Sequence, residues 1–282
     1  MDQDIVYAPD KPWDAATALK AIAENGYVRI RLEDRQAGSL ADLLAAMSDY
    51  FGQSSQDKLK NMSPDFNFGF RPFGRQYSIT PDRPDLNESF TYWADDPSLI
   101  PRSAEIADFV AALSGYRRCV AGIAGALLSA AAVRFGSSHR VAFENASYLE
   151  TNWYFRTAER ELLQDRHEDG HVLTFAHSDA PGLEIELDGV MTPVAFQPGE
   201  LLVMPGSLIT YMTGGWIEPL FHQVRNHGLA RRRTVLYLVN PRLDEPVLPF
   251  IHNEFNADID INERTMNAGS MFGLPQAPVL QS

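Results

Sequence analysis

The sequence predicts a mainly β protein, a sandwich or jelly roll, that carries its helices in the N-terminal half. Helical hydrophobic periodicity fills much of the chain before residue 140, and seven short apolar runs separated by turn signals follow between residues 147 and 239. Short strands with regularly spaced turns are typical of sandwiches and jelly rolls. No linker-like stretch separates the two halves, so we expect a single domain over residues 1–282.

Three helices and one strand are expected in the helical N-terminal part, residues 1–140, which would wrap the core. The first helix, 15–24, ends at Asn25-Gly26, a pair suited to the positive φ of a helix C-terminus. Residues 27–32 alternate with a period of two, as a half-buried strand does. Apolar residues keep helical spacing over 39–51 and over 104–133, which predicts two further helices.

The β-rich part, residues 141–245, is expected to form the jelly-roll core. Its strands are predicted at 147–155, 172–176, 183–187, 201–204, 208–212, 221–224 and 234–239. Turn signals separate them at Pro181-Gly182, Asp188-Gly189, Pro198-Gly199, Pro205-Gly206 and Gly214-Gly215.

Composition excludes several classes of function. The chain has 24 Lys and Arg residues against 37 Asp and Glu, a formal net charge of −13, which argues against nucleic-acid binding. The only cysteine, Cys119, rules out an internal disulfide framework and favours a reducing compartment. The N-terminus lacks the apolar stretch of a secretory signal, and the apolar run 119–133 is shorter than the roughly 20 residues of a membrane span. We therefore expect a cytoplasmic protein, a monomer or weak oligomer, that binds neither nucleic acid nor membrane.

Three histidines, His167, His177 and His252, are each followed two positions later by an acid. A metal site made of two histidines and one carboxylate needs a His and an acid on one strand edge, and a second His from a later strand. No histidine follows His252, and the His177 triplet runs into a turn. We therefore favour His167 and Asp169 together with His222, a polar residue in an apolar strand. The competing interpretation is a hydrogen-bonded core histidine beside a turn acid.

Arg232 and Thr234 open the last predicted strand. Residues two apart on a strand face the same way, so this pair suits a small carboxylate, which takes charge-assisted contacts from the guanidinium and a hydrogen bond from the hydroxyl. Arg231 and Arg233 fall on the opposite face and are expected to be surface charges. A metal site with a carboxylate clamp nearby is what a chelating 2-oxo acid requires.

Five short sequence motifs follow one another along the chain between residues 152 and 241. They are Asn152-x-Tyr154, His167-x-Asp169, Pro181-Gly182-Leu183, His222-x-Val224 and Arg232-x-Thr234. In this order they resemble the 2-oxoglutarate/Fe(II)-dependent dioxygenases of the isopenicillin N synthase-like superfamily, which includes deacetoxycephalosporin C synthase. Residues 210–215 also look similar to the cephalosporin synthases. Thr replaces the family's usual Ser at the clamp, and the N-terminal half matches more loosely.

The resemblance implies a double-stranded β-helix, a distorted jelly roll, with Fe(II) held by His167, Asp169 and His222. It also implies that 2-oxoglutarate and O2 are consumed and that succinate and CO2 are released. An acid at position 169 leaves no coordination position for a halide, which disfavours halogenation. The residues expected to contact 2-oxoglutarate are Arg232, Thr234, Tyr154 and Asn152.

The activity implied is oxidation of a small molecule, either a secondary metabolite, as in antibiotic biosynthesis, or an amino-acid-like compound. Hydroxylation is the default outcome, with desaturation, cyclisation and epoxidation left open. One alternative is an isopenicillin N synthase-type Fe(II) oxidase that does not use 2-oxoglutarate. Another is a non-catalytic jelly-roll binding protein.

Substrate contacts are sought in the segment 61–102, which is irregular and rich in aromatic residues. A segment of this length favours an ordered functional loop, here one that folds over the iron site; the alternative is a surface loop packed on itself. Two interpretations are open for the C-terminal segment 246–282: a lid over the pocket, as in some relatives, or a disordered tail. Arginines in the loop would suit an acidic or amino-acid-like substrate. The candidate substrate contacts are Phe68, Arg71, Arg75, Tyr148 and Phe221.

Overall fold

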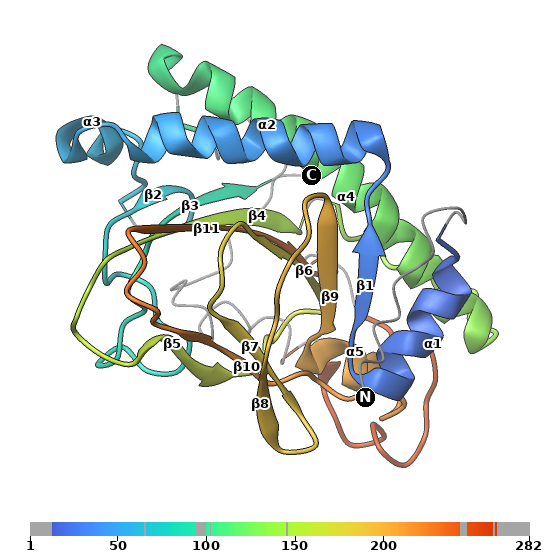
Figure 1. Ribbon diagram of the computed structural model, residues 1–282. Helices are drawn as coiled ribbons and strands as arrows, with labels where there is room; N and C mark the ends of the chain where they lie inside the picture. Colours follow the sequence, from blue (N-terminus) through green and yellow to red (C-terminus); the bar gives the residue numbers. More distant parts are fainter. Residues whose placement is uncertain are drawn as a thin grey trace.

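The computed structural model describes residues 13–263 except 65, 94–99, 102, 145, 243–246 and 262. The described chain forms two antiparallel sheets, and long helices cover the outside of the larger one (Figure 1). The predicted mainly β fold with N-terminal helices is confirmed. Of the C-terminal segment 246–282 considered as a lid, residues 246, 262 and 264–282 lie outside the described residues.

The larger sheet has seven strands in the order β1-β9-β6-β11-β4-β3-β2, and the smaller has four in the order β5-β10-β7-β8. Predicted strands and observed strands agree to within a few residues for most of the β-rich part. The strands are β1 (Val28–Arg31), β2 (Gly69–Arg71), β3 (Glu88–Trp93), β4 (Tyr148–Phe155), β5 (Leu162–His167), β6 (Leu173–Ser178), β7 (Leu183–Leu187), β8 (Val190–Pro193), β9 (Glu200–Pro205), β10 (His222–Arg225) and β11 (Arg231–Val239).

The first helix begins and ends at residues suited to capping. At the first helix, the Asp14 carboxylate accepts a 2.8 Å hydrogen bond from the Thr17 backbone N–H, and Gly26 ends the helix at φ 81°. The helices are α1 (Ala15–Asn25), α2 (Asp34–Phe51), α3 (Ser55–Leu59), α4 (Ala107–Arg134), which follows a short 3₁₀ turn at Ala104–Ile106, and α5 (Ser207–Met212).

One predicted strand is wrong. Residues 208–212 belong to α5, because a short apolar run does not distinguish a strand from a buried helix by its periodicity. Two backbone hydrogen bonds hold the first turn of α5 against the loop after β5: Ser207 N–H donates to the Asp169 carbonyl at 2.7 Å and Leu208 N–H to the His171 carbonyl at 3.2 Å. Helix α5 therefore supports the loop after β5, which contains the candidate metal ligand Asp169.

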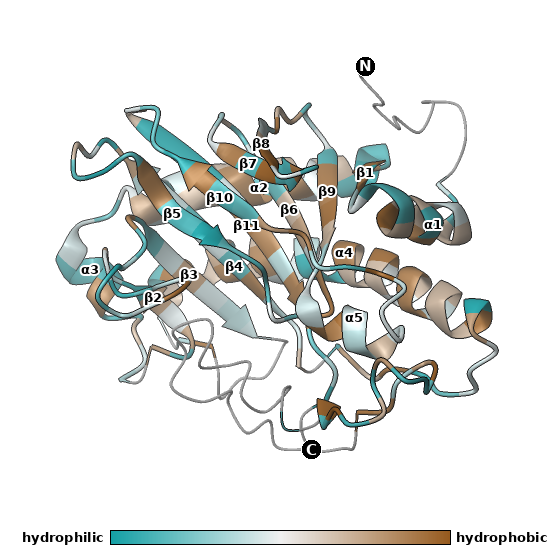
Figure 2. Cartoon of the chain, turned by 90° about the horizontal axis from the view of Figure 1, so that it is seen from below, coloured by the Kyte–Doolittle hydropathy of each residue, from teal (hydrophilic) through white to brown (hydrophobic). Residues whose placement is uncertain are grey.

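Apolar packing joins the helices to the larger sheet. Leu113, Val120 and Leu127 of α4 are fully buried in a core shared with α1, α2 and strands of that sheet. The segment Ala104–Arg134 is long and apolar enough to cross a membrane, but 56% of its most apolar window is buried inside the protein, as in a core helix. Figure 2 shows β9 coloured largely as hydrophobic, whereas β10, which starts at a candidate ligand, is largely hydrophilic.

Candidate metal centre

Pairing of two strands in the smaller sheet brings the two candidate histidines together. His167 is the last residue of β5, His222 is the first of β10, and the antiparallel register places them directly opposite one another. Their ring centroids are 4.3 Å apart. Asp169 follows two residues after β5, and the ligand atoms of all three side chains lie within 4.8 Å of one another.

Distances in this cluster distinguish a metal site from a hydrogen-bonded core. Oδ1 of Asp169 lies 3.7 Å from Nε2 of His167 and 3.8 Å from Nε2 of His222. Both separations exceed the roughly 3.2 Å limit of a good hydrogen bond. Three donor atoms that converge without bonding to each other are arranged as the ligands of a cation, and two imidazoles with one carboxylate suit Fe(II).

Backbone carbonyls fix the orientation of both rings. Nδ1 of His167 lies 2.7 Å from the Asp165 carbonyl, and Nδ1 of His222 lies 3.2 Å from the Leu220 carbonyl. A carbonyl only accepts, so each Nδ1 carries the proton and each Nε2 presents its lone pair to the cluster. Burial lowers the pKa of His222 to about 4, so this ring is neutral near pH 7, as a metal ligand must be.

The third ligand, Asp169, is also buried and held in place. Burial, the largest single influence, acts to raise its pKa, but the nearby imidazoles and the hydrogen bond from Thr174 together outweigh burial, and the pKa lies below its usual value. The Thr174 hydroxyl donates a short hydrogen bond to Oδ2. Gly206 permits the close approach of α5, because a Cβ there would lie only 2.1 Å from the His171 carbonyl oxygen.

The predicted carboxylate clamp lies in the pocket that also contains the metal cluster. Arg232 is 2% exposed, its Nη1 donates a 2.7 Å hydrogen bond to the Thr234 hydroxyl, and its guanidinium lies 4.9 Å from the Tyr154 ring centroid. Burial lowers the pKa of Arg232. Its Nε has no hydrogen-bond partner, and the guanidinium no ion pair, among the described residues. A buried cation of this kind fits a carboxylate ligand.

The turn before β7 shapes the space around this guanidinium. Gly182 has a φ of 144°, and a Cβ at this position would lie 3.1 Å from Nε of Arg232. The glycine of the Pro181-Gly182-Leu183 motif therefore leaves room for the arginine side chain.

The other predicted 2-oxoglutarate contacts lie on β4. Tyr154 lines the pocket, and its hydroxyl donates a 3.0 Å hydrogen bond to the Gln164 side chain. Asn152 is buried but is not part of the pocket wall. Its side-chain oxygen accepts a 2.9 Å hydrogen bond from Asn87, and its Nδ2 donates to Glu150 at 3.1 Å. Asn152 thus orients a wall residue rather than forming the wall.

Of the predicted substrate contacts, Tyr148 lines the pocket, with its hydroxyl 3.0 Å from Nε2 of His171. The other four lie elsewhere in the described structure. Phe68 packs on the cluster that contains Trp93, Arg71 is buried beside Glu150, Arg75 is exposed over the Phe66 ring, and Phe221 lies under the Arg166 guanidinium.

Sequence reasoning missed several residues of the pocket wall. The predicted loop does reach the pocket, through Gln76, Tyr77 and Ser78 rather than through its arginines. Glu150 also lines it, on the same face of β4 as Tyr148 and Tyr154, and the alternation that relates Asn152 to Tyr154 would have found it. Further wall residues that were missed are Gln164, His177, Phe196, Leu236 and Leu238.

Comparisons with known proteins agree with this fold. No family model matches the chain. Among curated proteins, it is 23% identical over 277 residues to oxoglutarate-dependent flavonoid 7-O-demethylase 1 of Ocimum basilicum, covering 90% of this chain and 70% of that protein. It is 30% identical over 112 residues to UPF0676 protein C1494.01 of Schizosaccharomyces pombe, and this match spans 36% of the chain and only 33% of that protein.

Solved structures similar to the chain include the rice dioxygenase for auxin oxidation, at a TM-score of 0.69 and 18% identity, covering 91% of this chain and 90% of that one. JOX2 in complex with 2OG, Fe and JA gives a TM-score of 0.70 at 15% identity, covering 83% of this chain and 73% of that one. The fold is that of the 2-oxoglutarate–Fe(II) oxygenases, which confirms the predicted distorted jelly roll and the likeness to this superfamily. The finer resemblance to deacetoxycephalosporin C synthase stays a prediction.

Proposed function

We propose that this chain is a mononuclear Fe(II), 2-oxoglutarate-dependent oxygenase that oxidises a small molecule. The observation that carries the proposal is the presence, in one pocket, of a convergent His167–Asp169–His222 cluster and a buried guanidinium, that of Arg232, without a carboxylate partner among the described residues. The first suits Fe(II) and the second suits the far carboxylate of 2-oxoglutarate. The similarity to an oxoglutarate-dependent demethylase supports the same activity.

Each residue has a defined part in this function. His167, Asp169 and His222 would hold Fe(II) from one side, while Arg232 and Thr234 would hold the co-substrate. Fe(II) with 2-oxoglutarate supplies, when bound, the oxidising chemistry that consumes O2 and releases succinate and CO2. Apolar wall residues keep water away from the site; they include Leu183, Val224 and Leu236.

The reaction outcome and biological setting are part of the proposal. Hydroxylation is the expected outcome, with desaturation and ring formation as variants of the same chemistry. A role in secondary metabolism, including antibiotic biosynthesis, a cytoplasmic location, and a monomeric or weakly oligomeric state are proposed on the sequence arguments above. The intact ligand set disfavours the non-catalytic binding protein.

An anaerobic titration of the Fe(II)-loaded protein with 2-oxoglutarate tests the proposal. A chelated 2-oxo acid gives a weak visible charge-transfer band, which we expect to appear here and to be lost or weakened in Arg232→Ala. Arg231→Ala is the matched control, because Arg231 is the preceding residue on β11 and is exposed.

The other outcomes of this titration separate the alternatives. Iron binding without the band would favour the isopenicillin N synthase-type oxidase. Absence of iron binding would contradict both iron-dependent functions and leave the binding protein.

A further inference from the structure

The middle of β4 places a carboxylate on the pocket wall. Glu150 is 5% exposed and lines the same pocket as the metal cluster. Tyr148 and Tyr154, on the same face of the strand, line it as well. A carboxylate is unexpected on the wall of a pocket whose co-substrate is a dianion. Which ligand Glu150 can bind therefore depends on the hydrogen bonds and ion pairs that its carboxylate already makes.

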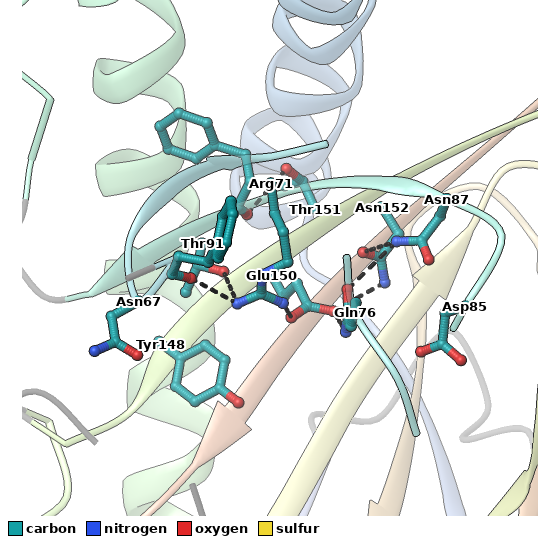
Figure 3. A network of polar contacts seen from close by, with 12 residues as sticks. Asn67, Arg71, Gln76, Asp85, Asn87, Thr91, Tyr148, Glu150, Thr151 and Asn152 are labelled. Atoms are coloured by element: carbon teal, nitrogen blue, oxygen red, sulfur yellow. Dashed lines mark hydrogen bonds and ion pairs between the residues drawn. The ribbon is translucent and has the colours of Figure 1, made fainter. Parts of the chain in front are cut away.

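Hydrogen bonds fix one oxygen of this carboxylate. Oε1 of Glu150 accepts a 2.8 Å hydrogen bond from Nε2 of Gln76 and a 3.1 Å hydrogen bond from Nδ2 of Asn152 (Figure 3). Asn152 is in turn held by Asn87 at 2.9 Å. The orientation of the Glu150 side chain is therefore set before any ligand arrives.

Arg71 balances the charge of Glu150. Its Nη1 lies 3.7 Å from Oε2 of Glu150, and the side chain is 1% exposed. Figure 3 shows Glu150 between Arg71 on one side and Gln76 on the other. Nη2 of Arg71 donates to the Phe66 carbonyl at 3.0 Å. Arg71 thus compensates an internal carboxylate and is not placed to bind the acidic substrate that the sequence suggested.

The second carboxylate oxygen of Glu150, Oε2, is available to accept a hydrogen bond. The 3.7 Å approach of Arg71 is an ion pair but too long for a hydrogen bond, and Oε2 accepts no hydrogen bond among the described residues. A neutral N–H or O–H donor entering the pocket would find there a fixed acceptor whose charge is already compensated.

We propose that Glu150 is the substrate-recognition group and that the substrate is a neutral molecule presenting a hydrogen-bond donor, such as an amide N–H, on an apolar body. This inference rests on the proposed function, in which Arg232 binds 2-oxoglutarate. Arg232 is the only Arg or Lys among the described wall residues and is assigned to 2-oxoglutarate, so an anionic substrate would lie beside the Glu150 carboxylate with no further basic side chain on the wall to pair with. The wall residues that would accommodate the apolar body are Tyr148, Phe196, Met204 and Leu238.

Three probes of nearly the same shape test the inference on the wild-type protein. Benzamide is neutral with a donor, acetophenone is neutral without one, and benzoate is an anion. Each is titrated anaerobically into the protein loaded with Fe(II) and saturating 2-oxoglutarate, with binding followed by saturation-transfer NMR and by perturbation of the charge-transfer band. We expect benzamide to bind at least about tenfold more tightly than the other two, the difference that one hydrogen bond to a charged group makes.

Substitution of Glu150 supplies the second arm. In Glu150→Gln the preference for benzamide over acetophenone should fall at least about tenfold, whereas Glu186→Gln, a carboxylate change outside the pocket wall, should leave it unchanged. Because the single variant leaves Arg71 buried without its counter-charge, the double variant Arg71→Met/Glu150→Gln is measured as well. The double variant removes both charges, so no buried charge is left unpaired. It should lose the preference for benzamide over acetophenone to the same extent as Glu150→Gln.

The contradicting results are distinct from those of the proposed function. Tighter binding of benzoate, equal binding of benzamide and acetophenone, no benzamide binding, or an unchanged preference in both Glu150 variants would overturn the role of Glu150. Failure of the charge-transfer band to form before any probe is added would instead contradict the proposed function.

Discussion

The Thr174 hydroxyl hydrogen-bonds to Oδ2 of Asp169, the carboxylate oxygen that does not face the two histidines. Oδ1 is thereby left to point between the Nε2 atoms of His167 and His222. Thr174 lies at the start of β6, so the strand itself sets the rotation of the carboxylate. Residues that orient a ligand in this way contribute to metal affinity without touching the metal.

Thr174→Val should therefore weaken Fe(II) binding by about 10–100-fold while leaving the fold intact. The valine fills the same volume but cannot donate a hydrogen bond, so Asp169 gains rotational freedom. Anaerobic competition against a metal-chelating dye measures the affinity, and Thr192→Val on β8 serves as the control. Unchanged affinity would show that the Asp169 carboxylate is oriented by the backbone alone.

His222→Ala should abolish iron binding and turnover together. The substitution removes one of three protein ligands and leaves a carboxylate and a single imidazole. Iron content after anaerobic reconstitution and 2-oxoglutarate consumption are the two measurements. The control variant His227→Ala, at an exposed position two residues beyond β10, should retain both iron binding and turnover. Turnover by the His222 variant would contradict the ligand assignment.

Gly182→Ala should weaken binding of 2-oxoglutarate more than binding of Fe(II). The added methyl group would meet Nε of Arg232 at 3.1 Å and displace the guanidinium from its place over the Tyr154 ring. The substitution also strains a backbone with positive φ, an effect that Gly189→Ala isolates, because Gly189 has φ 77° and open space around it. If both variants lose co-substrate affinity equally, steric contact with the clamp is not the cause.

Stability of the metal-free protein should fall as the pH decreases from about 6.5 to about 4. Burial lowers the pKa of His171 to about 4, so over this range the unfolded chain binds a proton that the folded state excludes. The free energy of unfolding should decrease by up to about 3 kcal/mol through this one group.

Urea unfolding of wild type and His171→Gln at a series of pH values measures this contribution. The variant should show a shallower dependence on pH over the same window, and His227→Gln should follow the wild type. Parallel curves for wild type and His171→Gln would assign the acid sensitivity to other groups.

Local rules account for only part of the site's geometry. Alternation along a strand places Arg232 and Thr234 on one face of β11, where a 2.7 Å hydrogen bond joins them. The sequence also indicated that His167, Asp169 and His222 would lie together, as they do. Their approach depends on the pairing of β5 with β10, because Asp169 lies in the loop after β5 and not on the strand.

Relationships between distant segments escaped prediction for a physical reason. Arg71 and Glu150 have no sequence signal that pairs them, and only the docking of β2 and β3 onto β4 brings them together. Arg233, expected to be a surface charge, does lie on the opposite face from Arg232, but its Nε donates to the Asp179 carboxylate at 2.7 Å and its Nη1 to the Ser48 hydroxyl of α2 at 2.7 Å. Such contacts depend on which elements become neighbours.

Pairing of β1 with β9 has a consequence for the order in which the protein can assemble during translation. The first strand to be synthesised is held by one of the last, and 171 residues separate Arg29 of β1 from Glu200 of β9. During synthesis on the ribosome, the backbone hydrogen-bonding groups of β1 therefore lack their partner strand until β9, and with it most of the core, has emerged. The metal centre is complete only once β10 is made, and the clamp only once β11 follows. A nascent chain that ends before β10 completes neither site, so iron can stabilise the protein only after β10 is made, and the co-substrate only after β11.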